Sequence, residues 1–239
     1  MAISLKACSL SCNPEKMKYV IISFVICSSL LLARDNISPN RFEQLSGKRN
    51  GSKDKKYWNK RYDRSSYIFG KAPEKFLSQN YKYIPEGSKV LDIAMGEGRH
   101  AVFLAKKGFK VTGIDISSVA VDKAKKLAGE VGARINMVVS SLTDYDFPAE
   151  SFDAIICFYY LDRRFNKKMI KWLKKGGILI FESFTMRQRK VRGYEHHNAK
   201  YLLKEGELLN LFPGHKILKY QEPLHLGTFS SSLILQKKK

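Results

Sequence analysis

Cysteine is scarce in this sequence, and its spacing suits neither a disulfide framework nor a zinc site. The four cysteines stand at positions 8, 12, 27 and 157, without a C-x-x-C pair and without a histidine at zinc-ligand spacing. Cys157 lies within the apolar run AIICF, which predicts a thiol buried in a hydrophobic core. We therefore expect no metal site and no disulfide framework.

Acidic residues are also in short supply. The 239 residues include 43 lysines and arginines against 22 aspartates and glutamates, which gives a formal net charge of +21. Residues 84–160 are balanced, with 9 basic and 10 acidic side chains, whereas residues 161–192 hold 11 basic and 2 acidic ones. The basic charge of residues 161–192 could attract an anionic small molecule, RNA phosphates or acidic lipid headgroups. Alternatively, its lysines form a solvated helix face. No RNA-binding module accompanies it, so nucleic acid is the less favoured partner.

No uncharged run in the N-terminal part is long enough for an ordinary membrane-spanning helix. Residues 19–33, YVIISFVICSSLLLA, have the length of a signal-peptide core instead. More lysines and arginines follow this run than precede it, which keeps the following domain on the cytosolic side of a membrane. We expect a signal anchor or organelle-targeting segment at 1–33, rather than a secretion signal. A flexible basic linker at 34–56 and one domain at 57–239 would follow.

The most informative stretch is Val90 to Ser117, VLDIAMGEGRHAVFLAKKGFKVTGIDIS. It reads as a strand, a glycine-punctuated turn, a helix and a second strand that ends in an acid, the order of a βαβ unit that binds an adenosine cofactor. Gly96 and Gly98 allow a tight turn close to a ligand, and a carboxylate at Asp115 accepts ribose hydroxyls. The third glycine of the dinucleotide fingerprint is missing, and Asp92 stands before the turn. Both departures disfavour a pyrophosphate.

These residues resemble the first motif of the class I S-adenosylmethionine (SAM)-dependent methyltransferases, hhDhGxGxG, which reads VLDIAMGEG here. Ala94 replaces a glycine of that motif, which we expect to be tolerated at negative φ. The segments W-x-x-R-Y, FYYLDRRF and GGILIFESFT resemble the tellurite-resistance and thiopurine-type small-molecule enzymes, over about Tyr57 to Gln236. The resemblance implies SAM as cofactor, S-adenosylhomocysteine (SAH) as product, and a segment before the first motif that folds over the cofactor.

The resemblance also implies which residues hold the cofactor. In that family an acid at the end of the second strand binds the ribose, and the turn after the third strand faces the adenine. This chain has Ser141 where the family usually has an acid in that turn. The predicted cofactor-binding residues are Trp58, Asp92, Ala94, Gly96, Gly98, Arg99, Asp115, Ile116, Ser141, Leu142 and Phe158.

Beyond Asp115 the pattern alternates between strands and helices. The predicted elements are a helix at 119–131, strands at 135–139 and 151–160, a helix at 166–174 closed by two glycines, a strand at 178–184, a helix at 202–212, and strands at 217–220 and 229–236. They predict an α/β fold, namely the Rossmann-like seven-stranded class I methyltransferase fold. Its sheet is mostly parallel with an antiparallel last strand, and helices cover both faces.

The methyl acceptor is less well defined. FYYL follows the fourth strand in place of an NPPY or DPPY tetrad, which disfavours methylation of DNA bases or glutamine. A soft S, Se, Te or As nucleophile needs no catalytic base, whereas a hydroxyl does. We predict a small-molecule acceptor, with anionic acceptors included, and weak catalytic candidates at Tyr159, Tyr160, Arg163 and His196. The alternatives are an RNA or protein methyltransferase that uses residues 161–192, and a membrane-tethered SAM-binding factor with little turnover. The oligomeric state is left open.

Overall fold

The computed structural model describes residues 51–223 and 228–238. The predicted signal or anchor segment and residues 34–50 of the predicted linker lie outside this part of the chain. No helix within the described residues is long and apolar enough to cross a membrane. Residues 51–56, predicted as linker, instead belong to helix α2, Gly51–Tyr62. Asp54 in its first turn and Arg61 in its last both match the helix dipole, which favours helix over this charged stretch.

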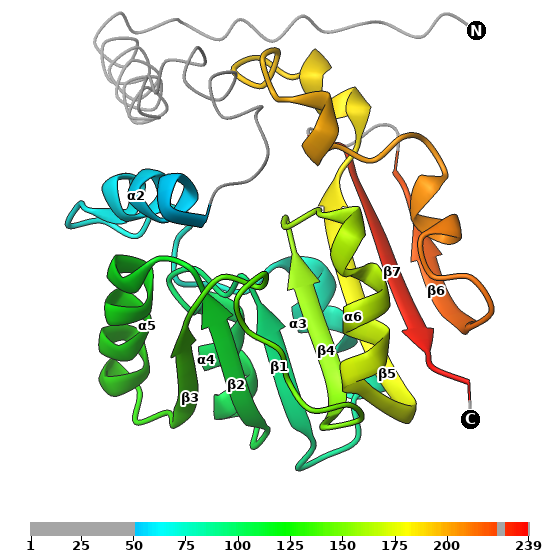
Figure 1. Cartoon of the computed structure of the whole chain (residues 1–239), viewed down its shortest axis with the longest axis horizontal. Helices are drawn as coiled ribbons and strands as arrows, with labels where there is room; N and C mark the ends of the chain where they lie inside the picture. The colour runs from blue at the N-terminus through cyan, green and yellow to red at the C-terminus, as the bar shows by residue number, and fades with distance from the viewer. Residues whose placement is uncertain (1–50, 224–227, 239) are drawn as a thin grey trace, which may run out of the picture. The chain divides into compact units, whose positions relative to one another are not determined.

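Seven strands form a single sheet in the order β3-β2-β1-β4-β5-β7-β6 (Figure 1). β7 is antiparallel to its neighbours β5 and β6, and the other four pairs are parallel. The predicted Rossmann-like seven-stranded fold is therefore confirmed. The strands are β1 Lys89–Ile93, β2 Lys110–Asp115, β3 Ile135–Val139, β4 Phe152–Phe158, β5 Leu173–Phe184, β6 Lys216–Gln221 and β7 Ser230–Gln236.

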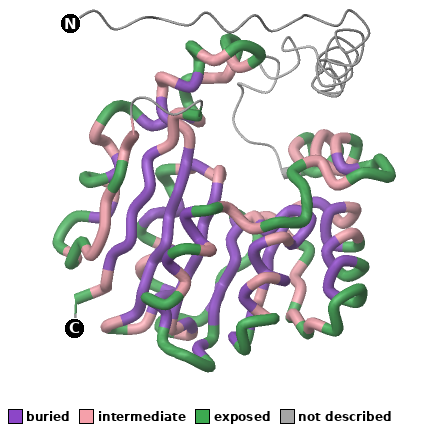
Figure 2. Tube along the Cα trace, turned by 180° about the vertical axis from the view of Figure 1, so that it is seen from behind, coloured by how far each residue is buried: buried purple, intermediate pink, exposed green. Residues whose placement is uncertain are grey.

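Helices cover both faces of this sheet, as predicted. Helices α3 (Lys75–Asn80), α4 (Arg99–Lys106) and α5 (Ser118–Glu130) contribute to one apolar cluster, and α6 (Asn166–Trp172) contributes to the other. Alternate residues of the central strands point into the two clusters, so both faces are apolar and the strands are buried along most of their length (Figure 2). The predicted helix at 119–131 corresponds to α5.

Two predicted helices were wrong in extent. α6 ends at Trp172 and β5 begins at the next residue, so the paired glycines lie inside a strand. A Cβ on Gly177 would lie 2.9 Å from the carbonyl oxygen of Asp153, at the point where β4 and β5 shift register. The second glycine therefore allows the two strands to approach closely, and it does not close a helix.

The helix predicted at 202–212 is reduced to one 3-10 turn, Glu207–Asn210. Gly206, just before this turn, has φ of +67°, and Leu203 forms an isolated bridge to Thr185. Leu203 and Leu208 of this segment are nevertheless buried in the apolar cluster on one face of the sheet. The leucine spacing that predicted a helix reflects this burial. An irregular chain packed on a sheet also places apolar residues at intervals close to those of a helix.

The parallel strands bring their carboxyl ends to one edge of the sheet. Helix α2 lies over this edge beside α5, in the blue part of Figure 1. The turns after β1, β2, β4 and β5 therefore meet beneath α2 and the segment that follows β5. This is the edge at which open α/β sheets bind their ligands.

Candidate active site

The turn after β1 is held in left-handed backbone conformations. Ala94, Gly96 and Gly98 have φ of +53°, +56° and +84°. The expectation of a negative φ at Ala94 was therefore wrong, because this turn needs a left-handed residue at that position whichever side chain it carries. A Cβ on Gly98 would lie 2.7 Å from the Cβ of Ala124, so glycine there is also what lets α5 pack against the turn.

Asp115 ties the end of β2 to this turn. Its two carboxylate oxygens accept the backbone N–H groups of Gly96 and Ser117, each at 2.8 Å. Burial raises the pKa of Asp115 to about 6, although these backbone donors partly offset the effect. The Asp115 carboxylate is therefore fixed beside the turn after β1, as the sequence pattern predicted.

Asp92 is buried at the end of β1. Within the described residues its Oδ2 atom has no hydrogen-bond partner, and burial, followed by the charge of Asp115, raises the pKa of Asp92 to about 8. A buried carboxyl group without a cationic partner is costly in an empty protein. It fits a ligand that brings positive charge, and it disfavours a phosphate.

Tyr62, at the end of α2, is the aromatic residue that lies against the turn. Its hydroxyl oxygen would be 2.9 Å from a Cβ on Gly96, and its side chain is buried. Burial and the charges of Asp115 and Glu97 raise the pKa of Tyr62. The predicted contact residue Trp58 instead stacks on Tyr62, with ring centroids 5.6 Å apart. The sequence did contain a signal for Tyr62, because Tyr62 is the tyrosine of the W-x-x-R-Y pattern.

The segment after α2 is fastened over the turn by a lysine on α5. Lys123 Nζ lies 2.5 Å from Glu97 Oε1, and it donates to the carbonyl oxygens of Ser66 at 2.6 Å and Arg64 at 3.0 Å. Glu97 Oε2 accepts the backbone N–H of Ile68 at 2.8 Å. The glutamate in the middle of the GEG turn therefore holds the covering segment.

Arg99, on α4, also holds the segment that covers the turn. It pairs with Glu74 at 2.7 Å and donates to the carbonyl oxygen of Phe69 at 3.0 Å.

Ser141, in the turn after β3, bonds within its own turn, where its hydroxyl oxygen accepts the N–H of Thr143 at 3.1 Å. Which of the eleven predicted residues touch the cofactor, Arg99 and Ser141 among them, stays a prediction.

An aromatic wall continues the site beyond β4 and β5. Tyr159, with φ of +56°, packs on Phe184 at 4.4 Å between ring centroids, and its hydroxyl donates to Glu182 Oε1 at 3.0 Å. Tyr194 and His197 stack at 4.8 Å, and His197 also faces Phe184 at 6.4 Å. Burial raises the pKa of Glu182 and lowers that of His197. The left-handed backbone of Tyr159 is the kind of strain that clusters at active sites, which supports a functional role for this wall.

The other weak catalytic candidates are placed less well for chemistry. Arg163 forms two hydrogen bonds with Glu207, at 2.6 and 2.8 Å, and also donates to the carbonyl oxygens of Lys200 and Leu202. This clamp joins the segment after β4 to residues 200–207. His196 is exposed, and Tyr160 packs its ring against the core. Tyr159 is the member of the set that stands beside a buried carboxyl group.

The basic segment 161–192 carries less free charge than its composition suggests, because six of its cations pair with acids. These pairs are Arg163–Glu207, Arg164–Asp162, Lys168–Asp146, Lys171–Asp146, Lys174–Asp153 and Arg187–Glu205.

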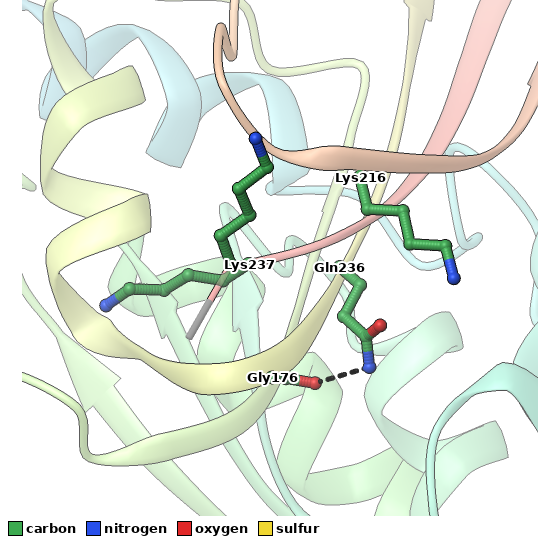
Figure 3. A pocket seen from close by; sticks show the side chains of 5 residues that line it. Gly176, Lys216, Gln236 and Lys237 are labelled. Atoms are coloured by element: carbon green, nitrogen blue, oxygen red, sulfur yellow. Dashed lines mark hydrogen bonds between the residues drawn. The ribbon is translucent and has the colours of Figure 1, made fainter.

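A separate cationic hollow of about 360 Å³ is lined by Gly176, Lys216, Gln236, Lys237 and Lys238 (Figure 3). Lys216 begins β6 and Gln236 ends β7, so this hollow lies at the edge of the sheet opposite Asp92. It is lined by lysines and a hydrogen-bonded amide, Gln236 to the carbonyl oxygen of Gly176 at 3.1 Å. It therefore contributes nothing to the carboxylate-lined site.

Comparisons with known proteins agree with this geometry. A family model described as a methyltransferase domain matches residues 90–177, which include the turn, Asp115 and the aromatic residues after β4. The ubiquinone/menaquinone biosynthesis C-methyltransferase UbiE of Geotalea daltonii is 32% identical over 165 residues, 64% of this chain and 70% of the relative. The chain belongs to the class I SAM-dependent methyltransferases.

Two further likenesses extend this assignment. The methyltransferase is 30% identical over 163 residues to a ubiquinone biosynthesis O-methyltransferase of Coxiella burnetii, over 63% of this chain and 67% of the relative. The solved structure of magnesium protoporphyrin IX methyltransferase from Synechocystis, with SAH bound, matches with a TM-score of 0.59 at 19% identity. That match covers 79% of this chain and 99% of the other, and it shows the shared fold.

SAM is the cofactor of this methyltransferase, and the residues at the turn fit it. SAM supplies a methyl group on a positively charged sulfur. Asp115 would hold the ribose. The buried carboxyl group of Asp92, with a pKa of about 8 in the empty protein, would lose its proton beside a sulfonium and stabilise that positive charge. The buried side chain of Tyr62 lies against the turn, and Trp58 stacks on its ring. The chain's own contribution is therefore to bind, orient and desolvate the reacting groups.

Proposed function

We propose that this methyltransferase transfers a methyl group from SAM to a small-molecule acceptor bound against Tyr159, Phe184 and His197. The observation that carries the proposal is the aromatic wall at the carboxyl edge of the sheet, where the turn after β1 would hold the cofactor. Its rings offer a planar apolar surface of the kind that binds small molecules, with a few polar atoms to orient them. The named relatives, which act in quinone biosynthesis, support a small-molecule acceptor.

The chemical class of the acceptor is open to two candidates. A soft nucleophile, with S, Se, Te or As as the reacting atom, needs no base and would use the wall for positioning alone. A hydroxyl acceptor needs a base, and the hydrogen bond from Tyr159 to the buried Glu182 favours this second candidate. An acceptor proton would pass to the Tyr159 oxygen as the Tyr159 proton passes to Glu182. The O-methyltransferase relative supports the same class.

Methyl transfer from radiolabelled SAM to a matched pair of probes distinguishes these candidates. Thiophenol and phenol present the same ring with a soft or a hard reacting atom, and arsenite and selenite extend the soft series. The proposal of a small-molecule acceptor fails if none of these and no quinol is methylated while bulk RNA or protein is. Among the hydroxyl acceptors, Glu182→Gln should lower kcat at least about tenfold, whereas thiol methylation should be unaffected.

We also propose that residues 1–33 act as a signal anchor or targeting segment that leaves the catalytic domain on the cytosolic side. The proposal is supported by the uncharged run at 19–33 and by the basic residues that follow it. Fractionation of cells that express the full chain or residues 34–239 tests it. Equal distribution of the two forms between membrane and soluble fractions would contradict the proposal.

A further inference from the structure

The parallel strands begin at the edge of the sheet opposite the cofactor site, and this amino edge is lined with cations. Lys89 begins β1, Lys110 begins β2 and Lys216 begins β6. β7 runs in the opposite sense and ends at this edge, where Lys216 and Lys237 line the cationic hollow (Figure 3). The exposed cations of the amino edge are Lys82, Lys89, Lys106, Lys110, Arg134, Lys175, Lys216 and Lys238.

Ion pairs do not neutralise the charge of this edge. None of the eight exposed cations pairs with an acid among the described residues. Glu86 is an exposed acid in the turn before β1. The other three acids at this edge are already held by other lysines, in the pairs Lys71–Glu130, Lys237–Glu150 and Lys174–Asp153. The amino edge therefore carries a net positive charge.

Exposed apolar side chains are interspersed with these cations. Tyr83 follows Lys82 and is 42% exposed, and Ile217 follows Lys216 and is 45% exposed. Val131, the residue after α5, is 40% exposed at the same edge. Removing such side chains from water is favourable. Lysines with exposed apolar side chains among them therefore fit a partner that offers both negative charge and an apolar interior.

The breadth and composition of the amino edge favour a lipid surface over RNA. Its cations extend from Arg134, before β3, to Lys216, at the start of β6, which are six strand spacings or about 30 Å apart. Seven of the eight are lysines, whose point charges suit a diffuse negative field, whereas arginine is the residue of choice for nucleic-acid recognition. Val131 and Ile217 offer no ring on which a base could stack.

We propose that the amino edge docks the methyltransferase on an anionic lipid surface. The lysines lie against the headgroups, and the exposed apolar side chains enter the boundary between headgroups and acyl chains. Because the cofactor site lies at the opposite edge of the sheet, it stays open to water in this orientation. The contact depends neither on the acceptor proposed above nor on residues 1–33, since all of its residues belong to the sheet and its connections.

Co-sedimentation of the full chain with lipid vesicles tests the proposal. The measured quantity is a ratio of two partition coefficients. One is for vesicles of phosphatidylcholine with about one-third phosphatidylglycerol, and the other is for phosphatidylcholine alone. The ratio separates the amino edge from an N-terminal anchor, because the uncharged run at 19–33 would contribute to both kinds of vesicle alike.

A triple variant removes three cations of the edge, with Lys110→Gln, Lys175→Gln and Lys216→Gln. We expect the ratio to fall at least about thirtyfold, because each lysine near an anionic surface contributes a gain of about fivefold. The matched control carries glutamine at three exposed lysines near the carboxyl edge, Lys60, Lys167 and Lys190. Its ratio should stay within about twofold of that of the unaltered chain.

Two outcomes would overturn the proposal. An equal fall in both triple variants would show a general attraction of the basic chain and no docking edge. An unchanged ratio in the amino-edge variant would show that these lysines do not meet lipid, and a loss of its salt-sensitive retention on bulk RNA would then identify an RNA surface. Thermal unfolding and SAM affinity, both expected to be unchanged, show that each variant is folded. Failure of the unaltered chain to bind SAM would count against the proposed function alone.

Discussion

The carboxylate of Asp115 accepts the backbone N–H of Gly96 at 2.8 Å, which joins the end of β2 to the turn after β1. Nineteen positions separate these residues in the chain, yet they define one side of the cofactor site. The same carboxylate also caps the start of the next turn through the N–H of Ser117. Asp115 thus shapes the turn in the empty protein, in the position from which it would hold the ribose.

Replacement of Asp115 by alanine should abolish measurable SAM affinity. The change removes the acceptor for the ribose hydroxyls and frees the N–H of Gly96, so we expect a loss of at least about a hundredfold in Kd by calorimetry. Asp122→Ala is the matched control, because Asp122 is exposed on α5 and pairs there with Lys125 alone. SAM affinity retained in Asp115→Ala would mean that the cofactor site has been misplaced.

The empty protein should lose stability as the pH rises from about 4 to about 8. Asp92 has a folded pKa of about 8, well above its ordinary value of 3.8, so the folded state holds a proton that the unfolded state releases. Stability from this group is complete below the ordinary value and falls by at most about 1.4 kcal/mol per pH unit up to the folded pKa. Urea unfolding at several pH values measures it, and Asp92→Asn should flatten the slope. An equally steep slope in Asp92→Asn would contradict the prediction.

Gly98→Ala should destabilise the protein by about 2–4 kcal/mol. Two costs add, because φ is +84° and the new Cβ would lie 2.7 Å from the Cβ of Ala124. Gly132→Ala is the control, since its φ is +65° but nothing lies within 4 Å of the new Cβ. We expect about 1–2 kcal/mol there, from backbone strain alone. Chemical denaturation of both variants measures the difference, and equal losses would show that contact with α5 is unimportant.

Lys123→Met should loosen the segment that covers the turn. It leaves Glu97 buried without its cation and removes the donor to the carbonyl oxygens of Arg64 and Ser66, so we expect a loss of about 3 kcal/mol and faster proteolysis of residues 62–69. Lys125→Met, on the same helix, breaks a pair that is exposed and should cost under about 0.5 kcal/mol. Identical digestion patterns for the two variants would argue against this role of Lys123.

Local residue patterns determined a large part of the fold. The apolar run before Asp92, the glycines of the turn and the acid at Asp115 identified β1, α4 and β2 in order, and the parallel sheet with its antiparallel last strand followed from the alternation of elements. These features are set by backbone geometry and by burial over short distances, which a sequence displays directly. The cofactor class followed from the same residues.

Tertiary structure decided which polar side chains are available to ligands. Arg163 and Arg99, both predicted as site residues, pair with Glu207 and Glu74, which are distant from them in the chain. Tyr62 lies against the turn with Trp58 stacked on it, because α2 crosses the carboxyl edge at one particular rotation. Long-range pairing and helix rotation depend on the packed whole, and no local pattern encodes them. The sequence therefore determined where the site is, and the tertiary structure decided which side chains form it.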